Sequence, residues 1–233
     1  MTFDPDYRYM LDIVSNRRPA RLPLYEHIIC PEIMEKILSV SFSGLIHGDS
    51  SDRREFARQF CRFFKEMTYD TVSFEVCITE ILPDHGAIMG GRPGPIQNRQ
   101  AFEAYPWDRL PELYWDLASK QFDAIAAELP PGMKALGGIG NGVLEISEDL
   151  VGYEYLAYLQ ADDPELFADI YVKIGDLMSV LWQYFLLICL SSAWVAWNGI
   201  RLMAGAGCWA PRPCLRPCSD LCCCSFRKVR AGL

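Results

Sequence analysis

The sequence predicts an α/β fold with a parallel sheet, and three observations support this. Short apolar strands alternate along the chain with longer helical segments. The helical segments repeat their apolar residues at a spacing of 3.6. A glycine-rich turn joins the last predicted strand to a helix, as in a βα unit. Strands that alternate with helices pair in parallel, but three predicted strands are too few for a closed barrel of eight.

Three segments are predicted as strands, namely residues 21–28, 71–76 and 133–139. The first contains Pro23, which suits the start of a strand better than its middle. The second alternates polar with apolar side chains and is rich in β-branched residues. The third is an apolar run in which only Lys134 is charged.

Helices are predicted wherever apolar side chains recur at helical spacing. Asp52, followed by Glu55, predicts a capping box at the start of the third helix, whose phenylalanines form a stripe that we expect in the core. Residues 82–97 are rich in glycine and proline and predict a loop. The predicted helices are residues 7–14, 31–38, 53–67, 111–129, a short segment after Gly142, and 164–185.

The net charge and the cysteines indicate which partners and which cellular compartment to expect. The net charge is −8, which argues against nucleic acid as a partner. The first 16 residues carry three aspartates and no apolar core of signal-peptide length. Cys30, Cys61 and Cys77 lie in apolar segments and are expected to be reduced and buried. These features favour a cytoplasmic protein.

Candidate site residues follow the three predicted strands, because α/β folds place their chemistry at the carboxyl ends of strands. They are Glu26 or His27 after the first strand, Glu75 near the end of the second, and Asn141 with Glu145 after the third. Glu26 and His27 are adjacent and therefore point to opposite faces.

His27, with Glu75 as its best-placed carboxylate, is predicted as a proton donor or a metal ligand. The alternative is an ion pair at the rim with a purely structural role. His47 and His85 lie beside glycines in predicted loops, where solvation is the expected state.

Five segments together resemble the uroporphyrinogen decarboxylase superfamily, over residues 5–186. They are the proline-containing segment 21–28, Tyr69-Asp-Thr-Val-Ser-Phe-Glu75, Ala104-Tyr-Pro-Trp-Asp108, the Gly-Gly-Ile-Gly-Asn-Gly turn at 137–142, and Ala161-Asp-Asp-Pro-Glu-Leu166. The resemblance implies the first three βα units of a (β/α)₈ barrel. It also implies a lyase that decarboxylates a tetrapyrrole in porphyrin biosynthesis without a cofactor, and a homodimer as the parent assembly.

The chain departs from that family at the residues that grip the substrate. The positions of two substrate-binding arginines fall on Ile28 and Glu32. The catalytic aspartate matches Glu75 or, in another register, Cys77, and the active-site tyrosine falls on Glu148. Because carboxylate-rich substrates need cations, these changes argue against true uroporphyrinogen as the substrate. The alternative within the superfamily is a corrinoid-linked methyltransferase, whose zinc ligands lie later in the family domain.

The C-terminal segment, residues 187–233, has a different composition. It holds six Lys and Arg against one acid, whereas residues 1–186 hold 16 against 29. Residues 177–197 carry no charge and are long enough to span a bilayer. Cys214, Cys218 and Cys222 could ligate zinc, but they lack the Cys-x₂-Cys pairs of structural sites. The third interpretation, which we favour, is a shifted reading frame, leaving an enzyme truncated and inactive in this form. A non-enzymatic, membrane-attached half-barrel is the remaining alternative.

Overall fold

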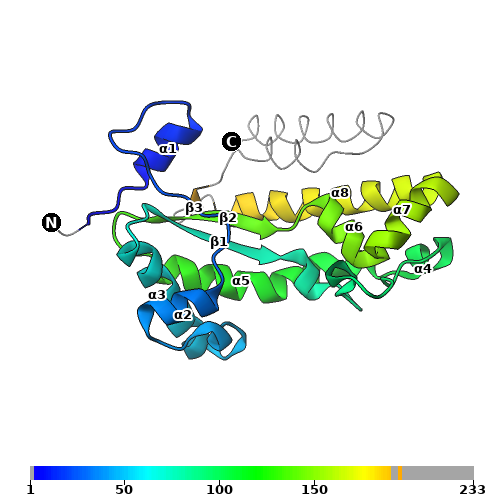
Figure 1. The fold of residues 1–233 in the computed structure, drawn as a ribbon, viewed down its shortest axis with the longest axis horizontal. Helices are drawn as coiled ribbons and strands as arrows, with labels where there is room; N and C mark the ends of the chain where they lie inside the picture. The colour runs from blue at the N-terminus through cyan, green and yellow to red at the C-terminus, as the bar shows by residue number, and fades with distance from the viewer. Residues whose placement is uncertain (1–2, 190–193, 196–233) are drawn as a thin grey trace. The chain divides into compact units, whose positions relative to one another are not determined.

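A computed structural model describes residues 3–189 and 194–195 of the chain. The fold is mixed α/β and mostly helical, with a small sheet (Figure 1). The α-helices are α1 (Arg8–Val14), α2 (Pro31–Leu38), α3 (Ser50–Glu66), α4 (Arg99–Ala104), α5 (Leu110–Glu128), α6 (Val143–Val151), α7 (Tyr153–Asp162) and α8 (Pro164–Cys189). The 3₁₀ helices are η1 (Ser43–His47), η2 (Ile78–Ile81), η3 (Ala87–Met89) and η4 (Trp107–Arg109), and the strands are β1 (Thr71–Cys77), β2 (Lys134–Gly140) and β3 (Trp194–Val195).

The chain divides into two compact units, which are described separately. The described part of the first unit is residues 3–76, 115–139, 185–189 and 194–195, and that of the second is 77–114 and 140–184. The division cuts β1 and β2 near their carboxyl ends, and it also cuts α5 and α8.

The sheet of the first unit has the strand order β1-β2-β3. β2 and β3 pair in parallel, with Ala135 opposite Trp194 and Leu136 opposite Val195. Figure 1 shows β1 and β2 side by side with their arrows in the same direction. The predicted strands 71–76 and 133–139 are therefore confirmed, and so is the α/β class with a parallel sheet. The predicted strand at residues 21–28 is wrong, because all of these residues are described and none belongs to a strand. Pro23 lacks the N–H that a ladder needs, and Leu22 and Ile28 are 76% and 65% exposed.

Aromatic packing builds the core of the first unit. Phe60 on α3 stacks on Phe56 at 5.4 Å between ring centroids and meets Phe74 of β1 edge-on at 5.5 Å. Phe122 of α5 continues the contact to Phe74 at 6.2 Å and to Phe185 at 5.1 Å. Such pairs add to area burial, and the predicted aromatic stripe is confirmed as core.

The predicted start of α3 is wrong by one turn. Asp49, not Asp52, is the N-cap, and its Oδ1 accepts from the N–H groups of Ser51 and Asp52 at 2.7 and 3.0 Å. Asp52 is the N3 partner of the capping box, since its Oδ2 accepts from the Asp49 N–H. Glu55 pairs instead with Arg58. Two aspartates three residues apart each satisfy the cap pattern, so the sequence alone could not choose between them.

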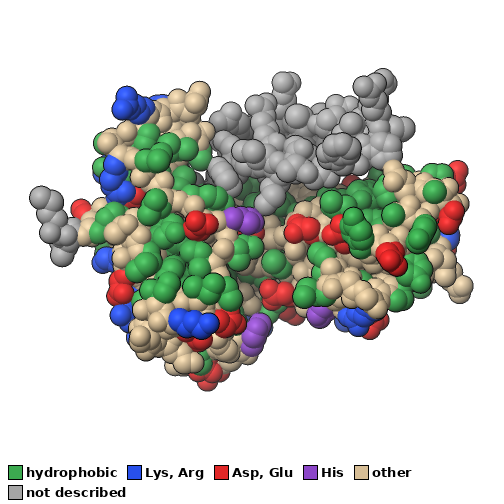
Figure 2. Space-filling view, in the orientation of Figure 1, with side chains coloured by type: hydrophobic (Ala, Val, Ile, Leu, Met, Phe, Trp, Pro, Cys, Tyr) green, Lys and Arg blue, Asp and Glu red, His purple; other side chains and the backbone are tan. Residues whose placement is uncertain are grey.

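An exposed apolar surface covers α2 and the segment before it. Figure 2 shows hydrophobic side chains gathered in this region. The exposed members are Leu22, Leu24, Ile28, Ile33 and Ile37. Larger surfaces of this kind mark places where another element packs.

The position where α8 ends tests the interpretation of residues 177–197 as a membrane span. α8 ends at Cys189, and Trp194–Val195 form β3 in the sheet, so the span is not one continuous helix. Residues 164–187 are long and apolar enough to cross a membrane by length and composition, with 28% of the most apolar window buried. A single helix of this kind is weak evidence for a membrane protein. Residues 196–233, with the cysteines predicted as possible zinc ligands, lie outside the described residues.

Candidate functional site

A histidine, a carboxylate and a phenol meet in the first unit. His27 Nε2 lies 3.6 Å from Glu75 Oε2, and the Tyr25 hydroxyl lies 3.3 Å from His27 Nδ1. Glu75, near the end of β1, has a side chain only 12% exposed, whereas the His27 side chain is 50% exposed. Burial, followed by the negative charges of Glu75 and Glu26, raises the pKa of the Tyr25 phenol. A phenol that keeps its proton can donate to Nδ1 in the His27 tautomer that carries its hydrogen on Nε2, the nitrogen nearer Glu75.

The segment that carries His27 is attached to the start of β1. The Arg21 guanidinium binds both carboxyl oxygens of Asp70, with Nη1–Oδ2 at 2.5 Å. Asp70 is fully buried and also accepts from the Asp6 N–H at 2.7 Å. The rings of Phe3 and Tyr9 each lie 4.8 Å from the guanidinium carbon. Sequence reasoning missed this pair, although a carboxylate directly before a buried strand was a usable signal.

In the second unit, Asn141 and Thr79 are hydrogen-bonded just beyond the ends of β2 and β1. Asn141 Oδ1 accepts from the Thr79 N–H at 3.2 Å and from Thr79 Oγ1 at 3.0 Å. Asn141 has φ of +70°, a left-handed conformation that asparagine tolerates better than most residues. With Oδ1 fixed, the two Nδ2 hydrogens can donate to another group.

The two predicted acids of α6 have different surroundings. Glu145 Oε2 accepts from the Gly142 N–H at 2.6 Å, so Glu145 caps its own helix. Glu148 is half-buried, and burial, then the neighbouring Glu145 carboxylate, raise its pKa. The structure thus places Glu145 in a structural contact, and places Glu148 where its proton is held more tightly than usual.

Asp149, which sequence reasoning passed over, anchors the glycine-rich loop. It is fully buried, and its Oδ1 accepts from the N–H groups of Gly86 and Ile88 at 2.8 and 3.1 Å. Its Oδ2 is buried without a hydrogen-bond partner among the described residues. Tyr105 is buried nearby, and burial, then the Asp149 charge, raise its pKa. The apolar spacing of α6 could have located this buried acid.

The other predicted positions are more exposed. Glu26 and Ile28 are on the surface. Glu32 accepts from the Cys30 thiol at 2.5 Å, a contact that lowers the pKa of the carboxyl. The expected burial is confirmed for Cys61, and this burial raises the pKa of its thiol. The expectation is wrong for Cys30, which is exposed, and Cys77 is half-buried.

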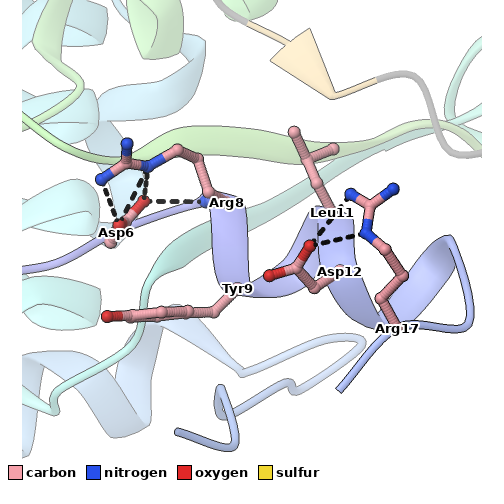
Figure 3. A pocket seen from close by; sticks show the side chains of 6 residues that line it. All are labelled: Asp6, Arg8, Tyr9, Leu11, Asp12 and Arg17. Carbon is pink, nitrogen blue, oxygen red and sulfur yellow. Dashed lines mark hydrogen bonds and ion pairs between the residues drawn. The ribbon is translucent and has the colours of Figure 1, made fainter. Parts of the chain in front are cut away.

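A pocket of about 470 Å³ lies beside α1 (Figure 3). Its charged lining is already paired, since Arg8 bonds Asp6 with Nη2–Oδ2 at 2.6 Å and Arg17 bonds Asp12 at 2.9 Å. Figure 3 shows that each arginine pairs with its neighbouring aspartate, so the pocket offers a ligand little uncompensated charge. Within residues 3–189 and 194–195, no group of three His, Cys, Asp or Glu side chains is placed to hold a metal ion.

Comparison with known proteins gives no relative. No protein-family model, no curated protein and no solved structure matches the chain.

Proposed function

We propose that residues 1–186 are the N-terminal part of a (β/α)₈ barrel related to the uroporphyrinogen decarboxylase superfamily. The proposed reaction is the decarboxylation of a carboxylate-bearing small molecule of the tetrapyrrole class, with His27 and Glu75 as the proton-transfer pair. The observation that carries the proposal is the 3.6 Å approach of His27 Nε2 to Glu75 Oε2 near the carboxyl end of β1.

The order of the elements supports a barrel. β1 and β2 are neighbours in the sheet and follow one another in the sequence, and Figure 1 shows their arrows in the same direction. The segment 21–28 joins β1 at both ends, through Arg21 with Asp70 and His27 with Glu75. Within residues 1–186, three consecutive segments (21–28, β1 and β2) then each lie beside the preceding one, as consecutive strands do in a barrel.

The pair has the parts that proton transfer needs. Loss of carbon dioxide leaves an electron pair on carbon, and a proton must be added there. A half-exposed histidine can deliver that proton from Nε2, because Nε2 lies 3.6 Å from Glu75 Oε2, beyond hydrogen-bond distance, while the Tyr25 phenol at Nδ1 orients the ring. The absence of arginine at Ile28 and Glu32 favours a substrate with fewer carboxylates than uroporphyrinogen.

The first test is a genomic read across codons 185–190. A single-base change that restores a long open frame supports the proposal, and a verified frame ending at residue 233 contradicts the barrel. The 233-residue chain alone is expected to show no turnover, because three strands cannot close a barrel of eight.

The second test uses the restored chain. Carbon dioxide release is measured under anaerobic conditions from porphyrinogens bearing four to eight carboxylates. His27→Gln and Glu75→Gln are expected to lower turnover by about 10²-fold or more, as loss of a general acid–base group does. The matched controls are His47→Gln and Glu66→Gln, both on exposed side chains. Wild-type turnover in both site variants, with loss of stability only, would make the pair structural.

A further inference from the structure

The segment that carries His27 is not held by the hydrogen-bond ladder of a described strand. Residues 22–26 lie in no described strand, and Leu22 and Leu24 are exposed. Pro23 is buried, but it offers no N–H to a neighbour. A segment of this kind needs side-chain contacts to fix its register beside β1.

Arg21 and Asp70 make contacts of the required strength. Their bond is bidentate, and a planar guanidinium fork fixes orientation as well as distance. Asp70 is fully buried, and two aromatic rings lie against the guanidinium of Arg21, so packing restrains both groups. Asp70 lies directly before β1, which ties the register of Arg21 to that of the strand.

The spacing along segment 21–27 and along residues 70–75 relates the position of the Arg21–Asp70 pair to that of the His27–Glu75 pair. His27 follows Arg21 by six residues, and Glu75 follows Asp70 by five. At about 3.3 Å per extended residue, both segments advance by roughly 17–20 Å. Because the two segments have a similar reach and are joined at one end by Arg21 and Asp70, His27 lies level with Glu75 at the other end.

We propose that Arg21 and Asp70 are positioning residues whose ion pair sets His27 opposite Glu75. The inference rests on the proposed function for the use of the pair, but the geometry it claims is tested without turnover. Arg21 acts through the placement of the segment and does not itself touch the reacting atoms.

The test is a nuclear Overhauser measurement on the full 233-residue chain. The chain has three histidines, so the ring signals of His27 are assigned by their loss in His27→Gln. Wild type is expected to give a cross-peak between the His27 ring and the Glu75 γ-methylene. Arg21→Gln is expected to reduce its intensity at least fivefold while the cross-peaks between Phe60 and Phe74 remain.

The control is Arg54→Gln, which breaks another ion pair of the first unit, with Glu128, and should leave the His27 cross-peak unchanged. If Arg21→Gln does not fold, Arg21→Lys decides, because lysine keeps the charge and loses the bidentate fork. A weakened cross-peak in Arg21→Lys supports the proposal. Wild-type intensity in a folded Arg21 variant, or no cross-peak in the wild type, overturns it. An intact cross-peak without turnover in the restored chain refutes the proposed function alone.

Discussion

Asp149 gives the sharpest stability prediction in the second unit. Replacing Asp149 by Ala removes the acceptor of two backbone N–H groups, those of Gly86 and Ile88. A fully buried donor left without a partner costs about 1–3 kcal/mol, so these two donors of half-buried residues together cost at most about 2–6 kcal/mol. Removal of the buried, unpartnered Oδ2 offsets part of this loss. We therefore expect a net destabilisation of about 2–4 kcal/mol.

The assay combines urea unfolding with amide hydrogen exchange. The Gly86 and Ile88 amides should lose protection in Asp149→Ala, because their exchange reports opening of the loop. Asp149→Asn is the matched variant, since its Oδ1 can still accept from both amides, and it should lose about half as much stability. A free energy of unfolding within about 0.5 kcal/mol of wild type in Asp149→Ala, a change typical of an ordinary surface substitution, would refute the reasoning.

Two further predictions concern β2 and α6. In Gly137→Ala the new Cβ would overlap the carbonyl oxygen of Phe74 in β1, so thermal unfolding should show a loss of about 3 kcal/mol or more. Gly90→Ala, with positive φ but open space, should lose about 1–2 kcal/mol. Equal losses in the two variants would count against a close approach of β1 and β2 at Gly137. Burial and the Glu145 carboxylate raise the pKa of Glu148 above its ordinary 4.5, so the native state binds the carboxyl proton of Glu148 more tightly than the unfolded state does. The free energy of unfolding contributed by Glu148 therefore rises as the pH falls through the raised pKa towards 4.5. Glu148→Gln should flatten this part of the curve of urea midpoint against pH and raise the midpoint at pH 7, whereas the exposed Glu154→Gln should leave the curve unchanged.

The parts of the fold predicted from sequence are those with a strong local signal. Residues 71–76 and 133–139 alternate or run apolar, and both are strands in the structure. α7 was missed because Tyr153–Asp162 has no regular apolar face. Its tyrosines are exposed, so burial gives no helical period there.

Only those residues of the candidate site that lie near the carboxyl end of a predicted strand could be predicted from the sequence. His27 and Glu75 were proposed as partners because each lies near the carboxyl end of an extended segment, and the structure places them 3.6 Å apart. Their catalytic role stays a prediction. The contacts of Arg21 with Asp70 and of Asp149 with Gly86 join residues 49 and 63 positions apart. No local period encodes contacts at that separation.

That residues 21–28 lie in no described strand follows from what surrounds this segment in a barrel. A first barrel strand has two neighbours, and β1 can supply only one of them. Without the other, a proline-containing segment with outward Leu22 and Ile28 gains little from a ladder. Side-chain contacts at its two ends, Arg21 with Asp70 and His27 with Glu75, then hold it alongside β1. The wrongly predicted strand and the proposed positioning pair thus have one physical origin: the segment has strand-like placement without strand-like hydrogen bonding.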